Sequence, residues 1–309
     1  MTVAHPLLER LRADVALGRR SAPDQPLTPC RGWRSPMARL LVFVVVLALF
    51  ALATVPFEQG GSAPEWVYQV AQLGGSVAAY LVLVWLVEGR WPPVELAWRR
   101  IGGLSAGLAM GAAGCLLVFL LCLAGGWRTV AGTNPDAPLL IPALQLGVVA
   151  AVSEEIIFRG VCFRLTEPAL GTWGAVLVSA GVFGGVHLGN PHATWWSALA
   201  IAVEAGVGFG LLYALTRSLW LVIGVHAAWN VVQGPVLGSA VSGATGNGDG
   251  LLVSLPSGPT HWSGGSFGLE ASLVAVLVWL ACSVWVARRL VAGRHTVTPA
   301  WRRPQALRN

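Results

Sequence analysis

The chain alternates between long apolar runs and short polar breaks. Eight of the runs can cross a bilayer as helices, because a spanning helix needs about 20 mostly apolar residues. Most breaks carry turn-forming residues, as in WPP, TNPDAP and NPHAT. The pattern predicts an all-α polytopic membrane protein with about eight transmembrane helices. The predicted spans are residues 38–57, 66–88, 101–125, 138–165, 172–190, 194–216, 219–237 and 268–292.

Composition points the same way. Hydrophobic residues make up 55% of the chain and charged residues only 11%, whereas a soluble domain typically carries about 25% charged residues. The five cysteines are odd in number and include no CxxC pair. This usage favours packing roles over a disulfide framework or a structural zinc site.

The basic residues follow a membrane topology. All 20 of them are arginines, and arginines and lysines accumulate in cytoplasmic loops. In the predicted topology only Arg128 falls on the opposite side from the others. Both termini are therefore predicted to be cytoplasmic, and the charge of +6 does not indicate a nucleic-acid partner.

Three regions follow from this topology. Residues 1–37 and 293–309 are predicted basic cytoplasmic tails, and residues 38–292 form the predicted transmembrane domain. The first tail contains PLLERLRADVALGRR. This segment can lie on the membrane surface as an amphipathic helix or form a disordered tail, and the sequence favours neither. The polar stretch before the first span is too long for a cleaved signal peptide.

A few ionisable residues remain inside the predicted spans. Each costs at least about 2.5–3.5 kcal/mol at a helix centre, so such residues usually face partners or water. Three short segments, EEIIFRG, FGGVH and HAAWN, each place two polar or aromatic residues four positions apart, on one helix face. The residues of these segments that matter are Glu154, Glu155, Arg159, Phe183, His187, His226 and Asn230, and Glu204 is a further acid inside a predicted span.

The depths of these residues are compatible. Glu154 lies about 14 residues before the turn near Pro168–Thr172, and His187 lies about 15 after it. At 1.5 Å per residue both are roughly 20–23 Å from the same end, and His226 and Asn230 reach roughly 12–18 Å. These side chains are expected to converge in one intramembrane polar site.

Several chemistries fit such a site. A glutamate beside a histidine can deprotonate a water, while His226 and Asn230 can donate hydrogen bonds to an oxyanion. Alternatively, two histidines and a carboxylate can bind zinc. A non-catalytic scaffold retaining the polar cluster for packing, and an ion-coupled transporter, are further alternatives. The transporter ranks last, because no paired interrupted helices are evident.

The three segments resemble the EExxxR, FxxxH and HxxxN motifs of the CAAX-protease and bacteriocin-processing family of intramembrane proteases, also called the Abi family. The connecting sequence SLWLVIGVHAAWNVVQGPVLGSAVSG and the later GPTHWSGGSFGLEASL are similar to long-form bacterial members. RWPPVELAWRR resembles the amphipathic elbow that precedes their third span. The resemblance runs from about Arg90 to Val291, and it implies a catalytic core at about 143–237.

The resemblance implies an eight-helix, CAAX prenyl protease-like endopeptidase in a bacterial inner (cytoplasmic) membrane, acting on a peptide or membrane-protein substrate. In the resemblance, Glu154 and His187 activate the hydrolytic water. His226 and Asn230 stabilise the oxyanion. The supporting residues are Glu155, Arg159 and Phe183.

The family is described both as a metalloprotease and as a metal-free, glutamate-dependent protease. Zinc on Glu154, His187 and His226 therefore stays an alternative to a site without a metal, and no other cofactor is expected. Two acids lie outside the motifs. Glu270 is expected to cap or close the last helix, and Glu204 to support the site or line water.

Overall fold

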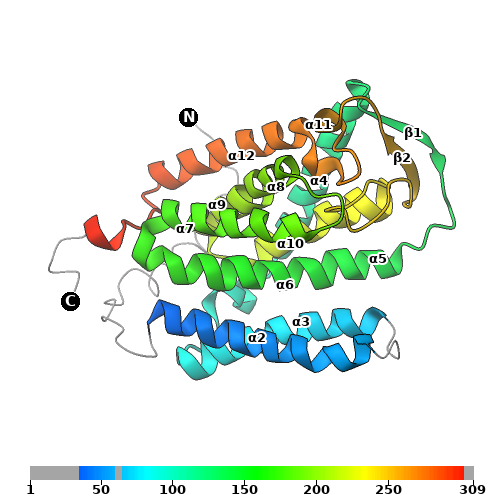
Figure 1. Cartoon of the computed structure of the whole chain (residues 1–309). Coiled ribbons are helices and arrows are strands. Elements are labelled where there is room, and N and C mark those ends of the chain that lie inside the picture. Colours follow the sequence, from blue (N-terminus) through cyan, green and yellow to red (C-terminus); the bar gives the residue numbers. More distant parts are fainter. Residues whose placement is uncertain (1–34, 60–64, 303–309) are drawn as a thin grey trace.

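The computed structural model describes residues 35–59 and 65–302 (Figure 1). Two parts of the chain lie outside the described residues. They are most of the predicted first tail, including the segment PLLERLRADVALGRR, and the end of the second tail.

Six stretches in the described part of the chain are long and apolar enough to cross a membrane. The longest, Leu140–Gly189, has 50 residues, but Gly171 interrupts it with φ 72° and ψ 172°. The chain doubles back there, inside α7 (Arg164–Val186) (Figure 1). The apolar helix α2 (Pro36–Gln59) has 24 residues. The turn at Gly171 divides the longest stretch into two spans, and α2 supplies one more. Each of the eight predicted spans therefore coincides with helix, and the predicted fold class is confirmed.

Several spans are built from more than one helical segment. The first half of the bundle contains α3 (Glu65–Leu81), η2 (Val82–Val87), α4 (Gly102–Ala124), α5 (Leu140–Leu144), η5 (Gln145–Ala150), α6 (Ala151–Glu155) and η6 (Ile156–Phe163). The second half contains α7 (Arg164–Val186), η7 (His187–Gly189), α8 (Trp195–Ile201), η8 (Ala202–Phe209), α9 (Gly210–Thr216), α10 (Leu219–Val231), η9 (Val232–Val236) and α12 (Leu273–Ala292).

Helix α10 is the central element of the bundle. Eleven of its residues are buried, among them His226 and Asn230. The outer helices instead expose apolar side chains, such as Leu116 on α4, Leu177 on α7 and Leu277 on α12. Apolar surface on this scale marks a membrane-facing exterior. The polar site is therefore surrounded by protein, and the lipid meets the outer helices.

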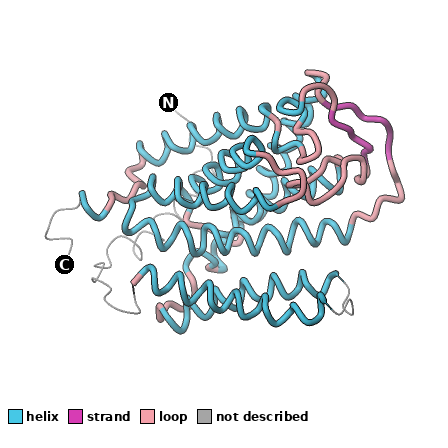
Figure 2. The backbone as a smooth tube through the Cα atoms, viewed as in Figure 1, coloured by secondary structure: helices cyan, strands magenta, loops and turns pink. Residues whose placement is uncertain are grey.

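A two-stranded antiparallel sheet lies at one end of the bundle (Figure 2). It pairs β1 (Arg128–Thr133) with β2 (Leu252–Pro256), with a register shift between Val130 and Gly132. The buried Arg128 donates to Asn247 and Ser254 and fixes the long loop after η9. The all-α prediction is thus correct for the spans but missed this sheet. A short helix, α11 (Thr260–Ser263), follows β2.

The segment WPPVELAWRR forms two 3₁₀ turns, η3 (Val94–Leu96) and η4 (Trp98–Arg100). The buried Glu95 accepts hydrogen bonds from Tyr80 at 2.6 Å and from Arg90 at 3.0 Å. Burial opposes the charged form of Glu95, but the positive charges of Arg164 and Arg90 outweigh it and lower its pKa to about 2. The carboxylate is therefore charged at neutral pH and ties this elbow to the bundle.

Helices α4 and α10 pack backbone to backbone. A Cβ at Gly111 would press into the Val225 carbonyl, whereas a Cβ at Gly181 on α7 would meet nothing within 4 Å. We expect Gly111→Ala to lower the free energy of unfolding by about 1–3 kcal/mol and Gly181→Ala to leave it nearly unchanged. Reversible unfolding in micelles measures both. Equal stabilities for the two variants would contradict this packing.

Candidate active site

The three motif segments meet at one point of the bundle. Glu154 and Glu155 end α6, His187 follows α7, and His226 with Asn230 lies on α10. The segments beside them, η5, η6, η8 and η9, are π-helical. Single π turns are frequent at functional sites, because they break the regular hydrogen-bond ladder. No feature of the apolar pattern predicted them.

A buried carboxylate joins two of the motifs. Glu155 Oε1 accepts from Arg159 Nη1 at 2.8 Å and lies 2.9 Å from His226 Nδ1. Arg159 also donates to the backbone carbonyls of Ala205 and Gly206 on η8. The side chains of Glu155 and Arg159 are both fully buried. Removal of either one would therefore leave the charge of the other uncompensated inside the protein.

The orientation of His187 follows from its neighbours. Its Nδ1 lies 2.7 Å from the Phe183 carbonyl oxygen, which can only accept a hydrogen bond. Nδ1 therefore carries the proton, and Nε2 of the neutral ring keeps its lone pair. The Phe183 ring stacks on the imidazole, with centroids 4.6 Å apart. Phe183 thus sets both the tautomer and the plane of His187.

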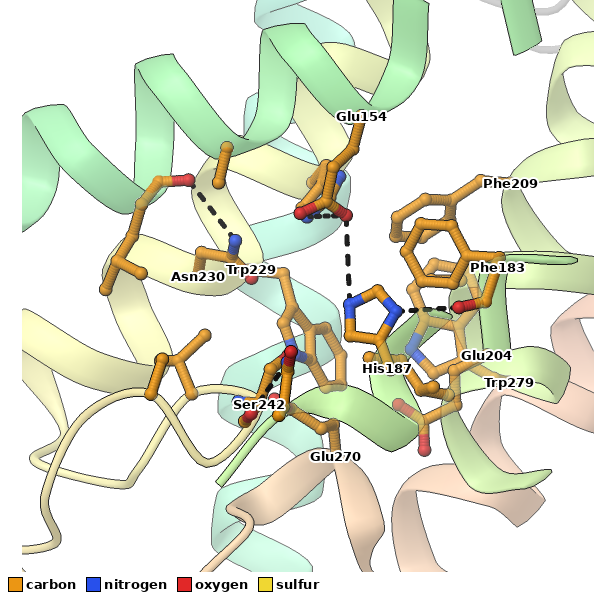
Figure 3. Close-up of a pocket in the computed structure, with 18 residues that line it drawn as sticks. Glu154, Phe183, His187, Glu204, Phe209, Trp229, Asn230, Ser242, Glu270 and Trp279 are labelled. Atoms are coloured by element: carbon orange, nitrogen blue, oxygen red, sulfur yellow. Dashed lines mark hydrogen bonds and ion pairs between the residues drawn. The ribbon is translucent and has the colours of Figure 1, made fainter. Parts of the chain in front are cut away.

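Glu154 faces His187 (Figure 3). Its Oε2 lies 3.9 Å from His187 Nε2 and 4.0 Å from His226 Nε2. This oxygen has no hydrogen-bond partner among the described residues. All three side chains line a cavity of about 130 Å³, which has room for a few waters at about 30 Å³ each. Glu154 and His187 therefore lie close together across the helical hairpin, as the sequence predicts.

Asn230 also lines the cavity. Its Nδ2 donates to the Leu146 carbonyl at 3.2 Å (Figure 3). An amide group has two N–H donors, and this contact engages one of them. The four residues predicted to be catalytic and Phe183 thus share one cavity, while Glu155 and Arg159 lie behind it.

The two acids outside the motifs also line this cavity. Glu270 accepts from Ser242 Oγ at 2.9 Å, from the Ser242 backbone N–H and from Gln233. It does not cap the last helix, because Ser272 caps α12 and Glu270 lies in a preceding turn, η10 (Leu269–Ala271). The expectation that Glu270 caps the last helix is therefore wrong.

Tetrahedral zinc requires a particular spacing of its ligands. An oxygen and a nitrogen ligand of tetrahedral zinc lie about 3.3 Å apart, because each bond is about 2.0–2.1 Å. The two glutamate–histidine separations, 3.9 and 4.0 Å, are wider. Within residues 35–59 and 65–302, no three His, Cys, Asp or Glu side chains are spaced to hold a metal. This arrangement does not fit tetrahedral zinc.

Fold and site define a class of protein: a multi-pass helical membrane protein with a carboxylate–histidine site enclosed by its helices. Residues 136–232, which contain all three motifs, match the family model of type II CAAX prenyl endopeptidase Rce1-like proteins. The chain is also 26% identical to the "Putative membrane peptidase YdiL" of Bacillus subtilis (strain 168) over 140 residues. These matches support membership of the CAAX-protease and bacteriocin-processing family.

The second alignment covers 44% of this chain and 54% of the Bacillus protein. The chain therefore spans about half the length of the curated relative it matches. No solved structure matches the chain.

Proposed function

We propose that this protein is an intramembrane endopeptidase in which Glu154 is the general base. The observation that carries the proposal is the convergence of Glu154 Oε2 and the Nε2 atoms of two histidines on one cavity. A carboxylate and a neutral imidazole can both accept a proton from one water molecule. The similarity of residues 136–232 to type II CAAX prenyl endopeptidase Rce1-like proteins supports the same reaction.

In the proposed first step, a water donates one hydrogen bond to Glu154 and the other to His187 Nε2. The separation of 3.9 Å between these two atoms suits one bridging water, since each hydrogen bond measures about 2.7–3.0 Å. Glu154 takes the proton as the water oxygen attacks the scissile carbonyl carbon. His187 can hold the water without further adjustment, because Phe183 already fixes its ring.

The carbonyl oxygen then becomes an oxyanion. We assign its stabilisation to His226 Nε2–H and to the second N–H of Asn230. Glu155 favours the doubly protonated His226 ring, because its carboxylate accepts from Nδ1 at 2.9 Å. Preorganised donors of this kind are worth about 2.7–4 kcal/mol each. Collapse of the oxyanion breaks the C–N bond, and Glu154 delivers its proton to the leaving amine.

The proposal is tested in cells. The N- and C-termini of membrane proteins are compared between cells that carry the wild type and cells that carry Glu154→Gln. We expect defined peptides or proteins to stay uncleaved only in the variant, and those molecules are the substrates. Matching inventories across several growth conditions, together with stable partners in a pull-down, would instead favour the scaffold.

The wide glutamate–histidine separations favour the glutamate-dependent form of the reaction over the zinc-dependent form. We expect the purified enzyme to keep its rate of peptide hydrolysis after treatment with EDTA and 1,10-phenanthroline. The measurement is kcat/KM before and after chelation, with zinc added back. Loss of activity on chelation that zinc alone restores would show that the side chains close around a metal.

A further inference from the structure

The cavity has a second acidic end that the proposed reaction does not use. Glu154 lies on one side of His187, and Glu204 and Glu270 lie on the other (Figure 3). The Glu204 side chain is on the π-helical segment η8, and the residue is only 3% exposed. Its Oε1 has no hydrogen-bond partner among the described residues. An unpaired carboxylate buried in this way is costly.

Glu270 does not relieve this cost. Its own partners, Gln233 and Ser242, are neutral donors. No arginine or histidine of the described residues forms an ion pair with Glu204 or Glu270. Two carboxylates that share a site disfavour each other's charge, and a cation placed between them would favour both. Among the described residues, the charged ring assigned to His226 lines the same cavity but pairs with Glu155, so neither Glu204 nor Glu270 has a cation of its own.

The walls of this end are apolar and aromatic. Phe209, Trp229 and Trp279 line the cavity, and the Trp279 ring lies 5.1 Å from Phe209 and 5.7 Å from Trp229, centroid to centroid. Aromatic faces attract cations, and apolar walls accommodate the methylene stem of a lysine or arginine. An apolar slot with an acid at its end is also how trypsin-like proteases select basic residues.

We propose that Glu204, supported by Glu270, binds the cationic side chain of a lysine or arginine adjacent to the scissile bond of the substrate. The inference rests on the proposed peptidase function, because the same cavity holds Glu154. It names the substrate class as peptides with a basic residue at the cleavage site. The aromatic walls hold the stem of that residue, and Glu204 supplies the missing counter-charge.

The test uses the full-length protein in lipid nanodiscs and pairs of internally quenched peptides. The members of a pair differ at one position near the cleaved bond: lysine against norleucine, or arginine against citrulline. We expect kcat/KM to be at least about tenfold higher for the charged member, as for a hydrogen bond to a charged group. In Glu204→Gln this ratio falls to near one. The control Asp136→Asn changes an exposed carboxylate outside the cavity and keeps the ratio.

A binding measurement separates this inference from the proposed function. In Glu154→Gln protein, N-acetyl-lysine methylamide should raise Tm, since a ligand of the folded state stabilises it. N-acetyl-norleucine methylamide should not, and adding Glu204→Gln should abolish the effect. If the wild type cleaves no peptide, the proposed function fails while this assay still tests the cation site.

Two results would overturn the cation site: equal kcat/KM for charged and neutral peptides in the wild type, or the same preference in Glu204→Gln. Either result would indicate a neutral, protonated Glu204 with a structural role. If Glu204→Gln does not fold, Glu270→Gln serves as the second variant. It removes the supporting charge and should reduce the ratio in part.

Discussion

Glu154→Gln is expected to lower kcat/KM for peptide hydrolysis by about 10²–10⁴-fold, the usual contribution of a general base. Glutamine keeps the shape of the side chain but cannot take a proton from the water between residue 154 and His187. Stability should not fall, because Glu154 Oε2 has no hydrogen-bond partner among the described residues and the side chain is 23% exposed.

The measurement is hydrolysis of a quenched peptide by purified protein in nanodiscs, with Tm recorded on the same sample. Asp249→Asn is a matched control, because it makes the same carboxylate-to-amide change at an exposed loop position outside the cavity. If Glu154→Gln hydrolysed the peptide at the wild-type rate, Glu154 would not be the general base. A fall in Tm matching the loss of rate would point to a structural role instead.

Glu155→Gln is expected to act mainly on stability. It leaves the fully buried Arg159 without its counter-charge, and breaking one partner of such a pair costs about 3–5 kcal/mol. Hydrolysis should fall as well, because His226 loses the carboxylate that holds its Nδ1. Reversible unfolding in micelles gives the free energy, and the peptide assay gives the rate.

Two further variants separate charge from packing. Glu155→Gln combined with Arg159→Met removes both charges and should recover much of the lost stability but none of the activity. Glu167→Gln breaks a different pair, with Arg217, whose side chain is 23% exposed. Water can solvate that arginine, so the loss should be smaller. Equal losses for Glu155→Gln and Glu167→Gln would contradict the view that burial makes the difference.

The helices could be predicted from the sequence because a bilayer leaves few alternatives. Backbone groups in hydrocarbon must bond within their own segment, so an apolar run of sufficient length becomes a helix. The meeting of Glu154 with His187 followed from equal distances to one turn, and Gly171 makes that turn. The family resemblance then assigned roles that spacing alone left open.

The parts that the sequence did not reveal depend on contacts between distant segments. The sheet forms only because β1 and β2, separated by more than a hundred residues, meet at one end of the bundle. Glu270 lies just before the last helix, yet it bonds to Ser242 and Gln233. The π turns leave the apolar pattern unchanged, so hydropathy carries no sign of them.

One oxygen atom, Glu155 Oε1, contacts both Arg159 and His226, and Arg159 in turn holds the backbone of η8. Substitutions at these three positions therefore cannot have independent effects, because contacting residues in one network are energetically coupled. In evolutionary terms the trio behaves as a single unit. Once a lineage has lost one member, little selection remains to keep the other two, and a change at any of them is tolerated only where the others have already changed.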